Sequence, residues 1–237
     1  MSTAPNRFNP SKVAALIPAY REAAHIGEVV QRVCEQLGTV LVIDDGSPDA
    51  TADCARQAGA EVIIHPENSG KGAAIKTGLR ALLEREFDYV LILDADGQHL
   101  PGEIGRFLSA AASDSGDLCG IWVGNRMHET DGMPRVRLYT NRFMSWMISR
   151  LCRQSIPDSQ CGFRMIHREV IPHLFCESNS YDYESEMLLI ASQNGYRIGN
   201  VPVTTVYADE TSKIKPIRDG LRFWKLLNRY RKKRPNV

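Results

Sequence analysis

Short apolar runs alternate with helix-like segments along the first half of the chain. Residues 13–17 and 40–43 are uninterrupted apolar runs of the length expected for buried strands. Between them, apolar side chains recur on one helical face, at Ile26, Val29, Val30, Val33 and Leu37. The alternation continues with a helix over 51–58, a strand over 61–65, a helix over 72–86 and a strand over 89–93. This order predicts an α/β fold whose mostly parallel central sheet carries helices on both faces.

The pattern changes in the second half of the chain. After a helix over 101–112 and a strand over 117–123, we expect a long helix over 135–153, an irregular segment over 160–164, a helix over 184–194 and a strand over 197–206. No linker rich in proline or glycine separates the two halves. The pattern therefore predicts one folded unit, in which the first half binds a nucleotide and the second half completes the site for another substrate.

The composition is that of a globular protein. Of 237 residues, 43% are hydrophobic and 24% are charged, and no apolar run approaches the roughly 18 to 20 residues of a membrane-spanning helix. Residues 1–10 are polar and hold two prolines, unlike a secretory signal. Six scattered cysteines without a Cys-x-x-Cys pair argue against a zinc site or a disulfide framework. We expect a cytoplasmic protein with reduced thiols.

The C-terminal segment concentrates positive charge. Residues 213–234 hold ten Lys or Arg and a single acid, although the net charge of the whole chain is only +1. Among them, apolar side chains recur at helical spacing, at Ile217, Leu221, Trp224 and Leu227. Such a basic amphipathic helix either lies on anionic lipid, as a peripheral contact with the cytoplasmic membrane face, or packs its apolar stripe on the core. A nucleic-acid partner is not expected, because this one short basic run comes without a nucleic-acid-reading motif.

The long helix predicted over 135–153 carries an apolar stripe of its own, with Phe143, Trp146 and Leu151. A lipid groove or a contact within a homo-oligomer would explain this stripe. Burial in the core is the interpretation that the pattern favours.

Polar residues gather where three of the predicted strands end, at 18–22, 44–47 and 94–99. The carboxyl ends of parallel strands meet at one edge of a sheet, which is where ligands of open α/β sheets bind. Carboxylates collected there repel one another and favour a cation such as Mg²⁺ or Mn²⁺, which would also hold substrate phosphates. Asp-Gly turns and helix caps explain each acidic loop when it is taken alone. Three such loops at successive strand ends favour a ligand site.

These loops resemble those of the inverting family 2 glycosyltransferases. The motifs that carry the resemblance are Pro18-Ala19-Tyr20-x-Glu22, Ile43-Asp44-Asp45-Gly46-Ser47, Asn68-x-Gly70-Lys71-Gly72 and Asp94-Ala95-Asp96-x-Gln98-His99. Within that family the chain is most similar to the dolichol-phosphate mannosyltransferase-like branch, which transfers a sugar to a polyprenyl phosphate. The resemblance implies a single Rossmann-like nucleotide-sugar-binding domain of the A-type glycosyltransferase fold over 1–212. Its donor half would span about 11–126 and its acceptor half about 127–212, followed by the basic helix at 213–237.

The resemblance also implies roles by position. Asp96 and Gln98 match the ligands of a Mg²⁺ or Mn²⁺ ion, and Asp96 and Arg126 match catalytic residues. The residues that match donor contacts are Pro18, Tyr20, Glu22, Ile43, Asp45, Asp94, Ala95, Asp96, Arg126 and Lys213. Those that match contacts of the acceptor phosphate, or the loop around it, are Arg137, Asn141, Asp158 and Arg164.

The predicted reaction is the transfer of a hexose, with inversion, from a GDP- or UDP-sugar to a polyprenyl phosphate, whose anionic oxygen needs no strong base. Transfer to a sugar hydroxyl in cell-envelope glycan or glycolipid synthesis is the alternative. It would need a base such as Glu184 or Glu186, two acids that would also suit the dipole of a helix start. A non-catalytic nucleotide-sugar-binding protein is a second alternative.

Overall fold

The computed structural model describes residues 8–114, 118–128, 130, 132–180, 182–204 and 216–232, the last range with side chains from 223 to 231. Within these residues, seven strands form one sheet in the order β3-β2-β1-β4-β6-β5-β7. They are β1 (Val13–Ala19), β2 (Val40–Asp44), β3 (Glu61–Ile64), β4 (Tyr89–Ile92), β5 (Cys119–Asn125), β6 (Arg164–His167) and β7 (Arg197–Pro202). Neighbouring strands are parallel except around β6, which is antiparallel to both β4 and β5. The predicted α/β class with a mostly parallel sheet is confirmed.

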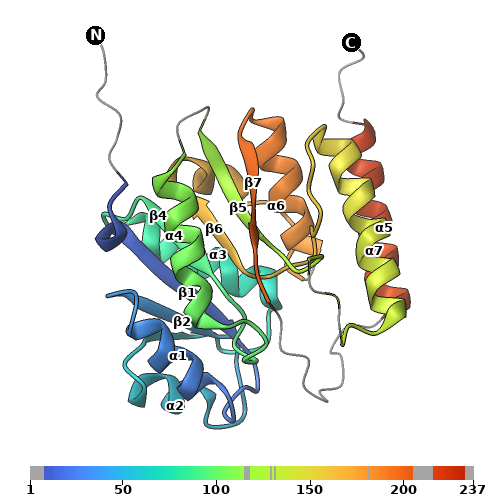
Figure 1. The fold of residues 1–237 in the computed structure, drawn as a ribbon. Helices are drawn as coiled ribbons and strands as arrows, with labels where there is room; N and C mark the ends of the chain where they lie inside the picture. The colour runs from blue at the N-terminus through green and yellow to red at the C-terminus, as the bar shows by residue number, and fades with distance from the viewer. Residues whose placement is uncertain are drawn as a thin grey trace.

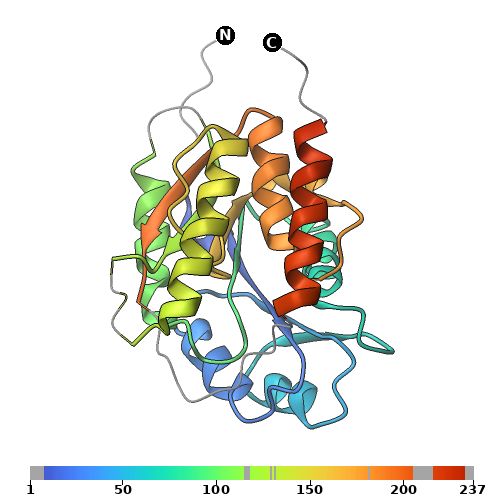
Figure 2. The ribbon, with the colours of Figure 1, turned by 90° about the vertical axis from the view of Figure 1, so that its right-hand side faces the viewer.

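Helices cover both faces of the sheet (Figure 1). The face turned to the viewer carries α1 (Ile26–Cys34), α2 (Thr51–Gln57) and α4 (Ile104–Ala112), and the opposite face carries α3 (Lys71–Leu83) and α6 (Asp182–Gln193). Next to α6 lie α5 (Arg135–Cys152) and α7 (Pro216–Lys232), so that these three helices form one side of the molecule (Figure 2). Short 3₁₀ helices occur at Pro10–Lys12, Pro101–Glu103 and Arg168–Leu174.

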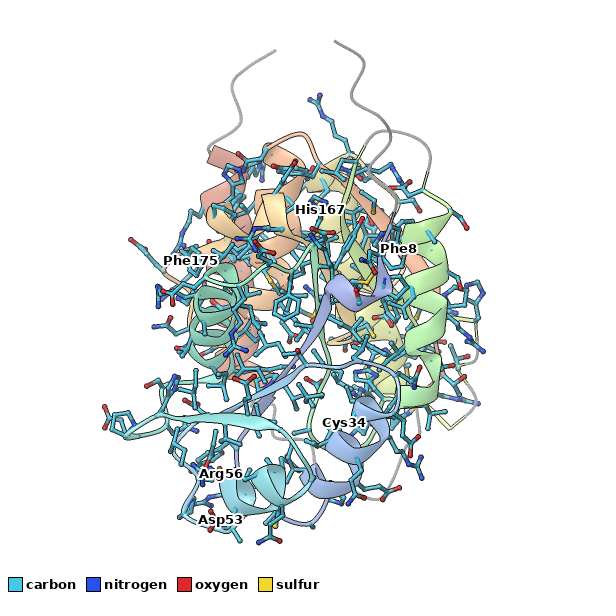
Figure 3. All side chains as sticks on the ribbon, turned by 90° about the vertical axis from the view of Figure 1, so that its left-hand side faces the viewer. Phe8, Cys34, Asp53, Arg56, His167 and Phe175 are labelled. Carbon is cyan, nitrogen blue, oxygen red and sulfur yellow. The ribbon has the colours of Figure 1, made fainter. Side chains whose placement is uncertain are left out.

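The central strands are apolar because the helices exclude water from both of their faces. Every residue of β1 and of β2 is buried. At the amino end of the sheet, the ring of Tyr89 lies 4.9 Å from that of His167 and 5.5 Å from that of Phe8, between centroids, and these rings close the core at that end (Figure 3).

The strand β6 was missed from the sequence. The segment 160–164 was expected to be irregular, yet the strand begins at Arg164 and inserts between β4 and β5. Four residues are too few to show a period, and the antiparallel pairing of β6 joins partners that are distant in the chain.

The C-terminal segment forms the predicted helix, and α7 packs on the core. Phe223, Leu226, Leu227 and Tyr230 are buried. The hydroxyl of Tyr230 donates to Glu186 Oε1 of α6 at 2.9 Å, which fixes α7 on the domain. No helix in the part of the chain described here combines the length and the apolar character needed to cross a bilayer.

Candidate active site

The loop after β2 is organised by Asp45, a predicted donor contact. Its buried carboxylate accepts the backbone N–H groups of Ser69 at 2.9 Å and Gly70 at 2.7 Å. His65 Nδ1 lies 2.7 Å from the same carboxylate, and His65 Nε2 lies 3.0 Å from Thr77 Oγ1 on α3. Asp45 thereby holds the start of α3 at the carboxyl edge of the sheet. His65 was not predicted, because a single histidine after a strand gives no distinctive pattern.

The loop after β1 is tied to the loop after β2. The Arg21 N–H donates to Ser47 Oγ at 2.9 Å, and the Glu22 N–H donates to Thr51 Oγ1 at 2.9 Å. Thr51 donates in turn to Asp49, and this hydrogen bond lowers the pKa of the Asp49 carboxyl. Arg21 adopts a positive φ of 58°, an uncommon conformation for a residue with a side chain. These contacts join the loops after β1 and β2 into one continuous polar surface, which we call the polar wall.

The predicted donor residues differ in how exposed their side chains are. Pro18, Ile43 and Ala95 are buried parts of the strand ends, and Glu22 is buried beside His25, 3.4 Å from its Nδ1. Tyr20 is half-buried under the guanidinium of Arg21, which lies 5.2 Å from its ring centroid. Lys213 lies outside the described residues.

Lys71, the first residue of α3, joins two carboxylates from distant parts of the chain. Its ammonium lies 2.6 Å from Asp94 Oδ1, just after β4, and 3.1 Å from Glu184 Oε1, in the first turn of α6. Burial acts to raise the pKa of Asp94, but the charge of Lys71 and the contact with His99 outweigh it and hold that pKa far below its ordinary value. Burial also opposes the charge of Lys71, yet the two carboxylates raise its pKa. Asp94 and Lys71 are therefore both charged at neutral pH.

Glycines allow two loops to approach the cluster of Lys71, Asp94 and Glu184. A Cβ on Gly162 would lie 2.5 Å from Asp94 Oδ2, so the loop before β6 covers this carboxylate directly. Gly70 has a φ of 98°, and a Cβ there would lie 2.4 Å from Asn179 O. The first and second halves of the chain thus meet at the cluster.

Replacing Lys71 by methionine tests this cluster. We expect Lys71→Met to lower the free energy of unfolding by about 1–3 kcal/mol, because two largely buried carboxylates lose their counter-charge. The lowered pKa of Asp94 stabilises the fold above the ordinary aspartate pKa and ceases to do so as the pH falls through the folded value. In urea titrations, the deficit of the variant should therefore be full at neutral pH and shrink only as the pH falls below about 4. Glu184→Gln should recover part of the loss in the Lys71→Met background, and a deficit independent of pH would contradict the argument.

Asp96 and Gln98, the predicted metal ligands, lie beside the cluster. Asp96 Oδ1 accepts the backbone N–H of Gln98 at 3.0 Å, and burial together with the charge of Asp94 raises the pKa of Asp96. Among the described residues, no basic side chain forms an ion pair with Asp96, and no three His, Cys, Asp or Glu side chains converge into a preformed metal site. A carboxylate with excess negative charge and an amide oxygen suit a hard divalent cation that keeps waters and phosphate oxygens as further ligands.

Arg126 and Asp158 form a buried bidentate ion pair. Arg126 Nε lies 2.6 Å and Arg126 Nη2 lies 2.9 Å from the two oxygens of Asp158, and the Arg126 N–H also donates to this carboxylate. Arg126 was predicted to contact donor phosphate and Asp158 to contact the acceptor phosphate or shape its loop, and the structure brings these two residues together. Asp158 is fully buried, so its charge is compensated inside the protein.

The other predicted acceptor residues fall into two groups. Arg164 is fully buried and donates to the backbone carbonyls of Cys161, Ser159 and Glu184, so the structure does not bring its guanidinium to the surface of the site. Of the two roles implied by the resemblance, a contact with the acceptor phosphate or a part in shaping its loop, this position at the start of β6 favours the second. Asn141 and Arg137 lie in the first half of α5, buried and half-buried respectively.

The site therefore combines polar loops at the ends of β1 and β2, the neighbouring carboxylates Asp94 and Asp96, of which Asp94 is paired with Lys71, and buried arginines that hold the loops. Residues 14–175 match the family described as Glycosyl transferase family 2. The chain is 31% identical to the undecaprenyl-phosphate mannosyltransferase of Micrococcus luteus, over 82% of this chain and 84% of that protein. It is 30% identical to the UDP-N-acetylglucosamine–dolichyl-phosphate N-acetylglucosaminyltransferase of Methanococcus voltae, over 82% of this chain and 85% of that protein.

Solved structures show the same fold. Glucosyl-3-phosphoglycerate synthase from Mycobacterium tuberculosis, in complex with Mn²⁺, uridine diphosphate and phosphoglyceric acid, matches with a TM-score of 0.72 at 17% identity, covering 95% of this chain and 80% of that one. The family match spans every strand end that builds the site. The chain belongs to glycosyltransferase family 2 and is a glycosyltransferase of the A-type fold.

Proposed function

We propose that this glycosyltransferase moves a hexose from a GDP- or UDP-sugar to a polyprenyl phosphate, with inversion at the anomeric carbon. Two relatives, each of which matches over four fifths of the chain, are named as transferases that act on undecaprenyl phosphate and on dolichyl phosphate. The two names differ in the sugar, so their common element is the lipid phosphate.

The observation that carries the proposal is that two acids, Glu184 and Glu186, both have partners inside the protein. A sugar hydroxyl needs a proton acceptor, whereas a phosphate monoester is already anionic near neutral pH. Glu184 is held 3.1 Å from the ammonium of Lys71. Glu186 is buried behind α7, and although burial acts to raise its pKa, hydrogen bonds from Ser178, Cys176 and Tyr230 hold that pKa below its ordinary value. Both carboxylates are committed to partners, which favours an acceptor that needs no base.

Asp96 and Gln98 would hold Mg²⁺ or Mn²⁺ in this reaction. When bound, the ion supplies positive charge for the leaving nucleoside diphosphate and a template for its phosphates. Asp94 is oriented by Lys71 beside this position, and the wall formed by Tyr20, Glu22 and Asp45 would hold the base and ribose of the donor. A M. tuberculosis structure with the same fold contains Mn²⁺ and uridine diphosphate, in agreement with this assignment.

Arg126 would act at the donor diphosphate from its buried position at the end of β5. Its pair with Asp158 fixes the direction of the guanidinium, and Asp158 and Arg164 would shape the acceptor loop from inside rather than touch the acceptor. Arg137 and Asn141 on α5 remain the proposed acceptor contacts.

A donor and acceptor scan tests the proposal. Release of nucleoside diphosphate is measured with GDP- and UDP-sugars, with Mg²⁺ or Mn²⁺, and with or without a short-chain polyprenyl phosphate. We expect one donor to turn over at least tenfold faster when the lipid phosphate is present, and chelation of the metal to abolish this release. A short polyprenol without phosphate is the matched control. If a sugar hydroxyl stimulates release and the lipid phosphate does not, the acceptor proposal fails and transfer to a glycan replaces it.

A further inference from the structure

One side of α5 exposes a row of large apolar side chains. Val136, Tyr139, Phe143 and Trp146 recur at helical spacing and are 80%, 66%, 55% and 54% exposed. The rings of Phe143 and Trp146 are stacked with their centroids 6.1 Å apart. Phe143 and Trp146 were expected in the core, and that prediction was wrong. Apolar rows of this size on a protein surface mark sites of interaction.

A groove between α5 and α7 extends this row. It has a volume of about 450 Å³ and lies between Trp146 of α5 and Trp224 of α7, which is itself 55% exposed. The groove is also lined by Arg150, Arg153 and Arg231, and the guanidinium of Arg150 lies 5.6 Å from the ring centroid of Trp146. Cationic side chains beside exposed tryptophans suit a partner surface whose outer layer is anionic and whose deeper layer is apolar.

Positive charge predominates on α5 and α7 in the described residues, although Arg229 of α7 is paired with Glu177 and Glu186. Residues 135–153 contain five arginines and no acid, and residues 223–231 contain three basic residues and no acid. A second copy of the same surface would bring like charges together, which disfavours pairing of the face with itself. An anionic surface complements it.

The direction of the helices relates this side to the active site. The views in Figures 1 and 2 show α5 and α7 starting at the carboxyl end of the sheet and running toward its amino end. The exposed row therefore begins next to the loop from Arg126 to α5. A surface that meets the row would lie beside the loop that carries Arg126, at the end of the sheet where the proposed reaction takes place.

We propose that the row Val136, Tyr139, Phe143 and Trp146, together with Trp224 and the arginines of the groove, forms a docking surface for an anionic phospholipid bilayer. We name this set the α5 docking surface. The tryptophans lie at the level of the headgroups, and Arg150, Arg153 and Arg231 contact lipid phosphates. Of the two roles left open for this helix by its sequence, α7 combines parts of both, because Phe223, Leu226, Leu227 and Tyr230 pack on the core while Trp224 faces outward. The inference extends the proposed function but does not require turnover.

Vesicle flotation with the full chain tests the α5 docking surface. We expect binding to vesicles of 70% phosphatidylcholine and 30% phosphatidylglycerol at about 0.1 M salt, and at least tenfold weaker binding to phosphatidylcholine alone. Trp146→Ala/Trp224→Ala should weaken the binding at least tenfold. Ile64→Ala is the matched control, since Ile64 is 49% exposed but lies on β3 at the far edge of the sheet.

A second pair of variants tests the charges. Arg150→Gln/Arg231→Gln should weaken the binding roughly tenfold, whereas Arg32→Gln/Arg56→Gln should not, because those arginines lie on α1 and α2. Figure 3 shows Arg56 on the side opposite to the view of Figure 2. Tryptophan emission should shift to the blue with anionic vesicles in the wild type and not in the Trp146→Ala/Trp224→Ala variant, since the third tryptophan, Trp122, is buried.

Three results would overturn the inference. They are a wild type that ignores anionic vesicles, equal loss of binding in the variants and their controls, and a dimer in light scattering that the Trp146→Ala/Trp224→Ala variant abolishes. Lipid-independent hydrolysis of the donor should be unchanged in these variants. If vesicles bind but polyprenyl phosphate never stimulates turnover, the acceptor proposal fails while the docking surface stands.

Discussion

Asp96→Asn is expected to lower the rate of nucleoside diphosphate release by roughly a thousandfold, the loss that follows removal of a major electrostatic stabiliser from an active site. Asparagine keeps the shape of the side chain and the hydrogen bond from the Gln98 N–H, so the change is confined to the charge that would hold the cation. The expected result is a loss in kcat together with a weaker apparent affinity for Mg²⁺ or Mn²⁺ in a metal titration.

Although its activity should fall, the stability of Asp96→Asn should stay the same or rise. Burial and the charge of Asp94 raise the pKa of Asp96, so the ionised carboxylate is unfavourable in the folded protein above that pKa. Without added metal at neutral pH, Asp96→Asn should therefore unfold at the same temperature as the wild type or a higher one. Asp53→Asn is the matched control, because Asp53 is an exposed aspartate on α2 whose partner is the surface residue Arg56. Retention of more than a tenth of the activity in Asp96→Asn would contradict the proposed role.

Features that depend on local order along the chain were predictable from the sequence. The parallel strands β1, β2 and β4 are short apolar runs, and each is followed by the acidic or polar loop that the edge of the sheet requires. Alternation of runs and helical stripes specifies a parallel sheet because each crossover places a helix on a face. The fold class and the enzyme family follow from this order and from the loop motifs, and both are confirmed.

Interactions between distant segments were beyond the reach of the same patterns. Lys71 was noted only within the motif Asn68-x-Gly70-Lys71-Gly72, and Glu184 only as a possible base or an acid at a helix start, yet their side chains meet 3.1 Å apart. For Asp158 and Arg164, the resemblance implied either a contact with the acceptor phosphate or a role in shaping the loop around it, and it did not show that both side chains are fully buried. Their full burial depends on partners elsewhere in the chain, which spacing alone does not show.

The sequence also did not show which apolar stripes of the helices face solvent. The same periodicity describes a stripe that faces the core and one that faces outward, so Phe143 and Trp146 gave no sign of their direction. The structure separates the two cases, since α5 faces α6 with Ser145, Ile148 and Cys152 buried and presents its aromatic side outward. A surface of this kind is found only when the packing of the helices is known.

Arg126→Met is expected to lower the free energy of unfolding by about 3–5 kcal/mol, because it leaves the fully buried carboxylate of Asp158 without its counter-charge. The double variant Arg126→Met/Asp158→Leu should lose less than Arg126→Met alone, since it removes both charges from the interior. Urea unfolding of the wild type, the two single variants and the double variant gives the coupling between the residues.

The matched control is another bidentate pair on the surface. Arg85 contacts both oxygens of Glu61 at 2.9 and 2.6 Å, but this pair is open to solvent, so Arg85→Met should cost less than about 1 kcal/mol. A loss in Arg126→Met as small as that in Arg85→Met would contradict the structural role of the buried pair.

Activity of the folded fraction separates the two roles of Arg126. If the guanidinium also stabilises the leaving diphosphate, Arg126→Lys should restore part of the kcat by supplying charge while remaining less stable than the wild type, because one ammonium cannot replace the two-pronged contact with Asp158.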